Sequence, residues 1–320
     1  MDKAIGLLII RTDAPNETGA DHFDIAPGVT IDFVKDMDAF MAPFARDEWK
    51  ARLGTQQWEQ HIDPPRDGSQ WVVTVEQDIP DIGTAVSWPA DYWKALKIAF
   101  SFGCHLSAHF LYGRLVDGIW KSFEFEEEAG WFDTEGSGKN DRPLTLEILY
   151  RWTDFAAKLI PLCCGKEACE RSDRFTEGVA LFCRGLQEYD IRHRLNCFIL
   201  ALEALICSPE GRQKEYFLSR IKCFWPQDQP ELLPPEKAVP IIHNIFFLKS
   251  KLDHLRDLGH GGTIRESYWS IVLQAEQLVR SAYSVVLSSP EHYACFTDWQ
   301  RQQDFWAARN NRILFQIADS

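Results

Sequence analysis

The sequence predicts a mainly α protein in two parts: an α+β N-terminal domain over residues 1–143 and an all-α helical bundle over residues 144–320. Three observations predict this fold class. A chain of 320 residues is long enough for about two domains. Short runs with strand-like alternation dominate the first part, and long apolar patterns at helical spacing fill the second. With 45% hydrophobic and 25% charged residues, the composition excludes global disorder.

In the first domain, short apolar or alternating runs bounded by turn residues predict four strands. These are Ala4–Arg11, Val29–Val34, Trp71–Glu76 and Trp120–Glu126. Between them, Asp36–Leu53 and Asp91–Ala99 repeat apolar residues at helical spacing and predict amphipathic helices. The stretch Gly130–Arg142 is rich in Gly, Asp, Ser and Asn, which predicts a linker. No motif assigns a role to residues 1–143.

The second domain is predicted to hold four or five long helices packed as a bundle. Apolar residues at helical spacing mark Thr145–Leu162, Arg174–Tyr189, Ile191–Cys207, Pro209–Phe224, Ala238–Gly259, Ile264–Leu287 and Thr297–Phe315. Pro209 suits a first helical turn, where its missing N–H has no partner to lose. The Pro-rich segment Pro226–Pro235 breaks the pattern, and Gly259 is the kind of residue that ends a helix.

The charge is negative and uneven along the chain. The net charge is −13, and residues 1–142 carry 13 basic and 25 acidic side chains against 21 and 22 in residues 143–320. Proteins that bind duplex nucleic acid along its backbone need a basic face, which this chain lacks as a whole. Any nucleic acid is therefore expected at a small local site, and the acidic first domain is expected to face a protein partner.

The nine cysteines are scattered, and no pair of C-x2-C motifs at zinc spacing occurs. Free, buried thiols in a reducing compartment are expected, so the predicted localisation is cytoplasmic, with no metal and no cofactor. No secretory signal and no apolar run of about 18 residues is visible, so no membrane contact is expected. His105 and His109 have the spacing of helical metal ligands but no apparent third ligand.

Glu203 lies in the apolar stretch of the helix predicted at 191–207, and Asn196 precedes it by seven residues on the same face. A carboxylate in apolar surroundings is unfavourable unless it is paired. Two interpretations follow. Glu203 is either a functional carboxylate beside a reactive site, or half of an ion pair that fixes the helix, with Arg184, Arg194 or Arg220 as its partner.

Lys249, Arg256 and His260 lie along one edge of the apolar stripe of the helical stretch Ile245–His260. A guanidinium can bind two phosphate oxygens, and an imidazole can transfer a proton near neutral pH, so Arg256 and His260 make a candidate phosphate site. The structural alternative is that Arg256 pairs with Asp253 or Glu203. His260 would then only interact with the negative end of a helix.

Three segments together resemble the Apea-like branch of the HEPN domain, an all-helical bundle. They are RLNCFILALEALI from Arg194, PEGRQKEYFLSRI from Pro209 and FFLKSKLDHLRDLGHGG from Phe246. The resemblance covers residues 144–288. The ALEAL block and the helix that ends in His-Gly-Gly are its specific parts, whereas residues 1–143 match no family.

Active HEPN proteins are metal-independent RNases whose Arg-x4–6-His motif lies where two protomers meet. Arg256 and His260 resemble this motif, with Asp257 as the polar follower, but only three residues separate them. Lys249 and His254 have the motif's spacing, but lysine cannot bind phosphate through a planar fork. The sequence favours Arg256 and His260, since Gly-Gly follows His260.

The resemblance implies a homodimer that cuts RNA, in stress or phage defence, by attack of a ribose 2′-hydroxyl on phosphorus. His260 would move the proton, Arg256 would stabilise charge on the phosphate, and Glu203 could orient either. The second hypothesis is a non-catalytic binding and dimerisation module for RNA, a nucleotide or a protein. The short Arg–His spacing and the negative charge motivate it.

Overall fold

A computed structural model of the chain describes residues 2–11, 21–26, 28–62, 70–79, 108–116, 119–127, 146–163, 174–188, 190–207, 213–224, 235–253 and 262–318. The chain divides into two compact units, residues 1–100 with 104–165, and residues 101–103 with 166–320. Helix α6 (Leu146–Cys163) falls in the first unit, whereas the sequence analysis placed it after a boundary at 143/144. That boundary lies outside the described residues.

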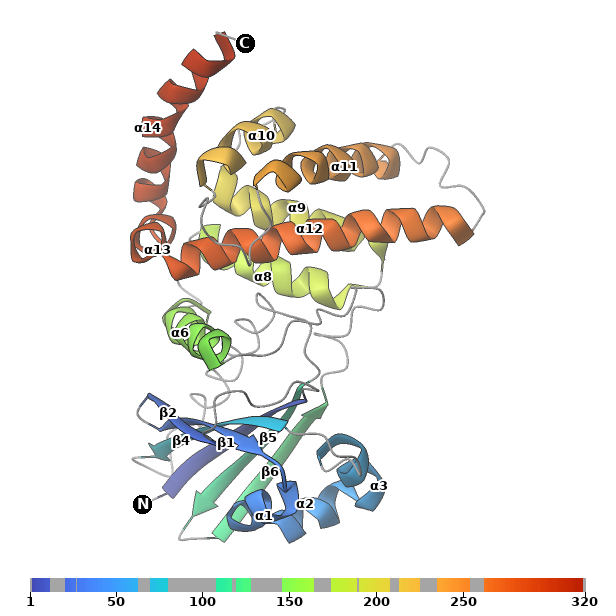
Figure 1. Cartoon of the computed structure of the whole chain (residues 1–320), viewed down its shortest axis with the longest axis vertical. Helices are drawn as coiled ribbons and strands as arrows, with labels where there is room; N and C mark the ends of the chain where they lie inside the picture. Colours follow the sequence, from blue (N-terminus) through green and yellow to red (C-terminus); the bar gives the residue numbers. More distant parts are fainter. Residues whose placement is uncertain are drawn as a thin grey trace. The chain divides into compact units, whose positions relative to one another are not determined.

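The first unit is built on a six-stranded antiparallel sheet in the order β2-β3-β4-β1-β5-β6 (Figure 1). The strands are β1 Asp2–Arg11, β2 His22–Ala26, β3 Val29–Val34, β4 Gln70–Ile79, β5 Ala108–Val116 and β6 Ile119–Glu127. The four predicted strands are confirmed, and β2 and β5 are additional. The helix predicted at 91–99 and the linker predicted at 130–142 lie outside the described residues.

The predicted continuous helix 36–53 is wrong, because the chain turns inside it. The structure has α1 (Met37–Met41), the 3-10 turn η1 (Ala42–Phe44) and α2 (Arg46–Leu53), followed by α3 (Thr55–Gln57) and the π turn η2 (Trp58–Ile62). Pro43 has no N–H to donate to a continuing helix. Ala45 then adopts left-handed backbone at φ 58° and ψ 48°, which separates the two helices.

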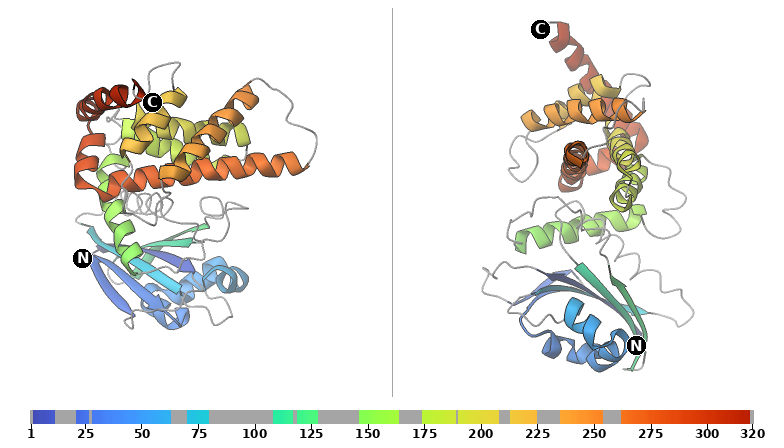
Figure 2. Two further views of the ribbon diagram at one scale, coloured as in Figure 1. Left: turned by 45° about the horizontal axis from the view of Figure 1, so that its top comes forward. Right: turned by 90° about the vertical axis from the view of Figure 1, so that its right-hand side faces the viewer.

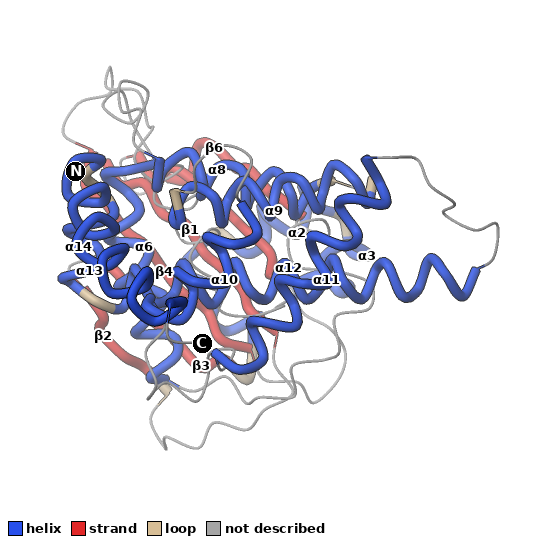
Figure 3. Tube along the Cα trace, turned by 90° about the horizontal axis from the view of Figure 1, so that it is seen from above, coloured by secondary structure: helices blue, strands red, loops and turns tan. Residues whose placement is uncertain are grey.

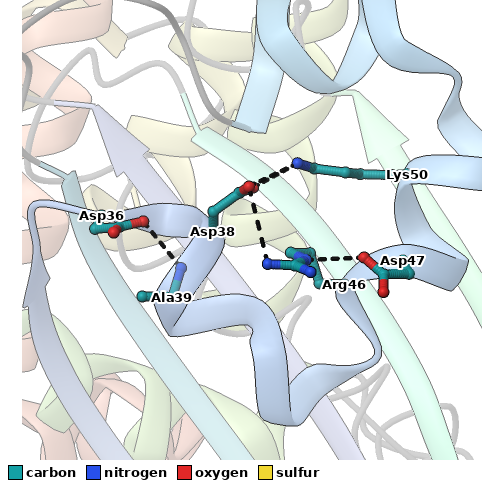
Figure 4. A network of polar contacts seen from close by, with 6 residues as sticks. All are labelled: Asp36, Asp38, Ala39, Arg46, Asp47 and Lys50. Carbon is teal, nitrogen blue, oxygen red and sulfur yellow. Dashed lines mark hydrogen bonds and ion pairs between the residues drawn. The ribbon is translucent and has the colours of Figure 1, made fainter.

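A polar network holds α1 and α2 together across this turn (Figure 4). The side chain of Asp36 accepts a 2.9 Å bond from the N–H of Ala39 and caps α1. Asp38 lies between two cations, with Lys50 Nζ at 2.6 Å and Arg46 Nη1 at 3.9 Å. These groups are partly exposed, so the network fixes geometry more than it adds stability.

One face of the sheet is covered by α1, α2, α3 and η2 (Figure 2). Because side chains alternate along a strand, Ile5, Leu7 and Ile9 of β1 share one face, and all three are buried. The same core cluster contains Val34, Met37, Met41, Trp49, Trp58, Ile62, Val72 and Leu111. Along β4 every residue from Trp71 to Val75 is buried, so both faces of the sheet are covered at that strand.

Gly28 makes the turn between β2 and β3 possible. Its φ of +73° is rarely adopted by residues with a side chain. Its carbonyl accepts a 2.7 Å bond from the N–H of Glu76 on β4, and a Cβ at Gly28 would collide with the carbonyl oxygen of Glu76. The turn at Gly28 therefore fixes where β3 lies along β4.

The second unit is helical throughout its described residues. Its helices are α8 Arg174–Gln187, α9 Ile191–Ile206, α10 Gln213–Phe224, α11 Pro235–Asp253, α12 Gly262–Ser288, α13 Pro290–Phe296 and α14 Trp299–Ala318. Helix α9 contacts α8, α10, α11 and α12, and Figure 3 shows these helices side by side. Where the structure describes the chain, none of its helices combines the length and apolar character needed to cross a membrane.

Two glycines let α8 approach its neighbours closely. Gly178 and Gly185 are seven residues apart and both are buried. A Cβ at Gly178 would collide with the hydroxyl of Tyr283 on α12 and lie 2.7 Å from Cβ of Ala204 on α9. A Cβ at Gly185 would lie 2.6 Å from the ring of Phe198. Any larger residue at these positions would push α8 away from the centre of the unit.

Candidate functional site

The predicted phosphate-binding pair, Arg256 and His260, lies outside the described residues, as do His254 and Asp257. The structure does describe the helices on either side of them. Helix α11 ends at Asp253 and α12 begins at Gly262, and both helices pack against α9 and against each other. The surroundings of the predicted site can therefore be described from α9, α10, α11 and α12.

The end of α11 is bonded to two other helices. Arg192, in the first turn of α9, donates from Nη2 to the carbonyl oxygen of Leu252 at 2.7 Å. Lys249, the accessory candidate, donates from Nζ to Oε1 of Gln213 at 3.3 Å. Gln213 is the first residue of α10 and its side chain is neutral, so the bond leaves the positive charge of Lys249 in place.

Glu203 lies in the last turn of α9, where its neighbours include Cys207 and Arg220. The chain leaves α9 through Cys207, which adopts left-handed backbone at φ 53° and donates its N–H to the carbonyl of Glu203 at 2.8 Å. Burial lowers the pKa of the nearby Arg220 guanidinium, and the charge of Glu203 is among those that oppose this. Burial also raises the pKa of the Cys207 thiol, while Arg174 lowers it.

Two of the three arginines considered as partners of Glu203 pair with other carboxylates. Arg194 pairs with the buried carboxylate of Glu276 at 3.0 Å. Arg184 is exposed and pairs along its own helix at 3.9 Å. Arg220, the third, donates to the carbonyl oxygens of Ile206 and Cys207, just beyond Glu203 in the chain. If Glu203 has a structural role, that role lies at the carboxyl end of α9, where Arg220 also binds.

The carboxyl end of α9 is capped by side chains from distant parts of the chain. The carbonyl oxygens of residues 204–207 have no partner further along α9 and need other donors. Arg220 donates to two of them, one at 2.8 Å. From α14, Gln302 Nε2 donates at 2.8 Å and Trp306 Nε1 at 2.9 Å. Arg220 also stacks on the Trp306 ring, 4.8 Å from its centroid.

The described helices place Glu203 and the end of α11 toward opposite ends of α9. Glu203 and Arg192 are eleven residues apart, which is about 16 Å along a helix at 1.5 Å per residue. Asn196 lies between them on α9 and is half-buried. That Glu203 orients Arg256 or His260 stays a prediction, and Arg192 is an α9 side chain that is bonded to the end of α11.

Comparison with known proteins gives no family. No family model, no curated protein and no solved structure matches the chain.

Sequence reasoning missed a buried ion cluster between α9 and α12. Glu276, with 1% of its side chain exposed, accepts from Arg194 at 3.0 Å and from Arg280 at 2.5 Å. Aromatic rings contact both guanidiniums at 5.1–5.7 Å from the ring centroids; the rings are Phe198 and Trp269 for Arg194, and Phe182 for Arg280. The separation of Glu276 and Arg280 by four residues on one helix is a sequence signal for this pair, but it signals neither the burial of the pair nor the contact with Arg194.

The metal and thiol predictions fall partly on described residues. His109 lies on strand β5, so the interpretation that His105 and His109 share one helix is wrong. His105 itself lies outside the described residues. Among the side chains described, no group of three or more His, Cys, Asp or Glu could hold a metal ion. Cys183 and Cys197 are buried free thiols, as predicted. Burial raises the pKa of the Cys197 thiol.

Proposed function

We propose that this chain is a HEPN-like, metal-independent endoribonuclease in which Arg256 and His260 act on the scissile phosphate. The order of its motifs carries the proposal: the ALEAL block at residues 201–205, then the LKSK block, then Arg256, His260 and Gly-Gly. The packing of α9, α11 and α12 against one another supports it, because the ALEAL block lies on α9 and the predicted pair follows α11 and precedes α12 in the sequence.

The proposed chemistry needs only these side chains and the RNA. His260 accepts the proton of a ribose 2′-hydroxyl while that oxygen attacks the adjacent phosphorus. The bond from phosphorus to the 5′-oxygen breaks, and the leaving oxygen takes the proton that His260 accepted, directly or through water, which returns His260 to its starting state. Arg256 stabilises the negative charge that builds up on the phosphate. The products are a 2′,3′-cyclic phosphate and a 5′-hydroxyl, and DNA is not cut because it lacks the 2′-hydroxyl.

Cleavage of RNA in excess EDTA tests the proposal. Single-stranded and transfer RNA are expected to be cut by the wild-type chain, and matched DNA is expected to survive. The rate should fall by about 10²–10⁴-fold in His260→Ala and by about 10²–10³-fold in Arg256→Ala. His243→Ala on α11 and Arg184→Ala on α8 serve as controls, because both side chains are exposed, and each should keep the wild-type rate.

Two results of this assay would overturn the nuclease proposal. They are the absence of cleavage by the wild-type chain and equal cleavage by wild type and His260→Ala. Saturable RNA or nucleotide binding without turnover would instead support the second hypothesis, a non-catalytic binding module. The net charge of −13 is the observation that favours it. In that case Arg256→Ala should weaken binding, and no RNA fragments should form.

The proposal includes a homodimer whose two copies form the site together, as the family resemblance implies. Sedimentation at micromolar concentration is expected to give a particle of twice the 36.9 kDa chain mass. An assay of His260→Ala mixed with Arg256→Ala extends the test, because a shared site should regain activity in mixed dimers. A single species at the chain mass while RNA is being cut would contradict this part.

A further inference from the structure

We propose that Arg192 is a positioning residue for this cleavage reaction: it fixes the end of α11, from which the chain continues to Arg256 and His260. The inference rests on the proposed function and adds a residue that the family motif does not contain. The juxtaposition that carries it is the first turn of α9 against the last turn of α11, joined by one hydrogen bond between residues 60 positions apart.

The bond satisfies an acceptor that α11 itself cannot satisfy. The last four carbonyl groups of a helix have no N–H partner within that helix. Leu252 lies in the last turn of α11, and its carbonyl accepts the 2.7 Å bond from Arg192 Nη2 in partly buried surroundings. A charged donor makes this bond stronger than a neutral one. Arg192 therefore acts as a cap supplied by another helix.

Arg192 is itself held in place. It is the second residue of α9, the helix that contacts four others in this unit. Asp190 caps that helix by accepting the N–H of His193 at 3.0 Å. This bond lowers the pKa of the Asp190 carboxyl, and the charge of Arg192 adds to the effect. A cation fixed in this way can hold the end of α11 without moving with it.

The position of this bond in the chain connects it to the reaction. Arg256 follows Leu252 by four residues and His260 by eight, and α12 begins at Gly262. Helix α12 also packs against α9. The helix before the predicted pair and the helix after it therefore both contact α9. Because a misplacement of about 1 Å can cost about 10²-fold in rate, release of the last turn of α11 should slow the chemical step.

The test compares Arg192→Ala and Arg192→Lys with wild type and with Arg184→Ala, the exposed arginine of α8. The kcat and KM for one RNA are measured in EDTA, and amide hydrogen exchange is followed over residues 246–262. In Arg192→Ala we expect kcat to fall by about 10- to 100-fold while KM changes by less than about threefold. Exchange at residues 249–253 should speed up, and the lysine variant should recover most of kcat.

Each other result overturns the inference. An Arg192→Ala enzyme with wild-type kcat, or with a change confined to KM, shows that the bond does not position the reacting groups. The same conclusion follows if the kcat of Arg192→Lys is no higher than that of Arg192→Ala. It also follows if amide exchange at residues 249–253 is unchanged in Arg192→Ala. If wild type cuts no RNA, the proposed function fails and this inference falls with it. If wild type is active and Arg192→Ala is equally active, the inference fails alone.

Discussion

Replacing Glu276 by glutamine is expected to lower the free energy of unfolding by about 3–5 kcal/mol. The carboxylate is almost fully buried and accepts from Arg194 and Arg280, whose side chains are 6% and 8% exposed. The amide keeps the shape of the side chain but removes the negative charge. Two buried guanidiniums then lie beside each other without the carboxylate between them.

Guanidinium-induced unfolding provides the measurement, with the m-value checked for constancy. Glu188→Gln is the matched control, because Glu188 forms an i,i+4 pair with Arg184 at 3.9 Å whose side chains are 31% and 72% exposed, worth about 0.5 kcal/mol at most. The triple variant Arg194→Met, Glu276→Leu, Arg280→Met should regain most of the loss. Equal effects of the Glu276 and Glu188 changes would show that the buried cluster is not desolvated.

Gly178→Ala should destabilise the chain by about 1–3 kcal/mol, although alanine is the better helix former by about 1 kcal/mol. The added Cβ would collide with the Tyr283 hydroxyl, which donates a 2.9 Å bond to the carbonyl of Ala201. Ala204 Cβ lies on the other side at 2.7 Å. Both neighbours are buried, so α8 must move outward to make room.

A double-mutant cycle isolates the steric cause of this effect. In a Tyr283→Phe background the hydroxyl is absent, so the cost of Gly178→Ala should shrink. Ala180→Gly on the exposed side of α8 is the control and should cost about 1 kcal/mol from helix propensity alone. A more stable Gly178→Ala variant would contradict the close approach of α8 to α9 and α12.

Most strands and helices with a clear periodic pattern of their own could be predicted, and elements without such a pattern could not. The strand predicted at Val29–Val34 has the bounds found in the structure, because hydrophobic alternation and the Pro27-Gly28 turn agree there. Strand β5 was missed because the evidence for it is its pairing with β1 and β6, and the sequence does not show that pairing. Helix α13 was missed although Ser289 followed by Pro290 is a helix start in sequence terms.

The candidate site was predicted from residue types and could be placed only in part. The sequence located Glu203 on an apolar helix, but not which arginine lies near it, since that depends on how α10 packs. Lys249 was selected for its spacing to His254, and the structure gives it a neutral partner in Gln213. Arg192 carried no sequence signal, because its bond is to a backbone carbonyl and any residue type supplies that acceptor.

The same limit explains why the ion cluster was overlooked. A Glu and an Arg four residues apart usually form a solvent-exposed pair, and the sequence around Glu276 gave no reason to expect burial. Only the approach of α9 brings Arg194 to this carboxylate, 82 positions away in the chain. Periodicity reports which face of one helix is apolar, whereas partner identity depends on the arrangement of several helices.

The cap that α14 places on α9 affects the time at which the second unit can finish folding on a ribosome. Trp306 follows its acceptor, Leu205, by 101 positions. At synthesis rates of about 5–20 residues per second, the carbonyls of Ala204 and Leu205 wait roughly 5–20 s for their donors on α14, although Arg220, which bonds the next two carbonyls, is made much earlier. A nascent chain that stalls within this interval would hold an unfinished helix end, and early chaperone binding there would protect it until α14 is made.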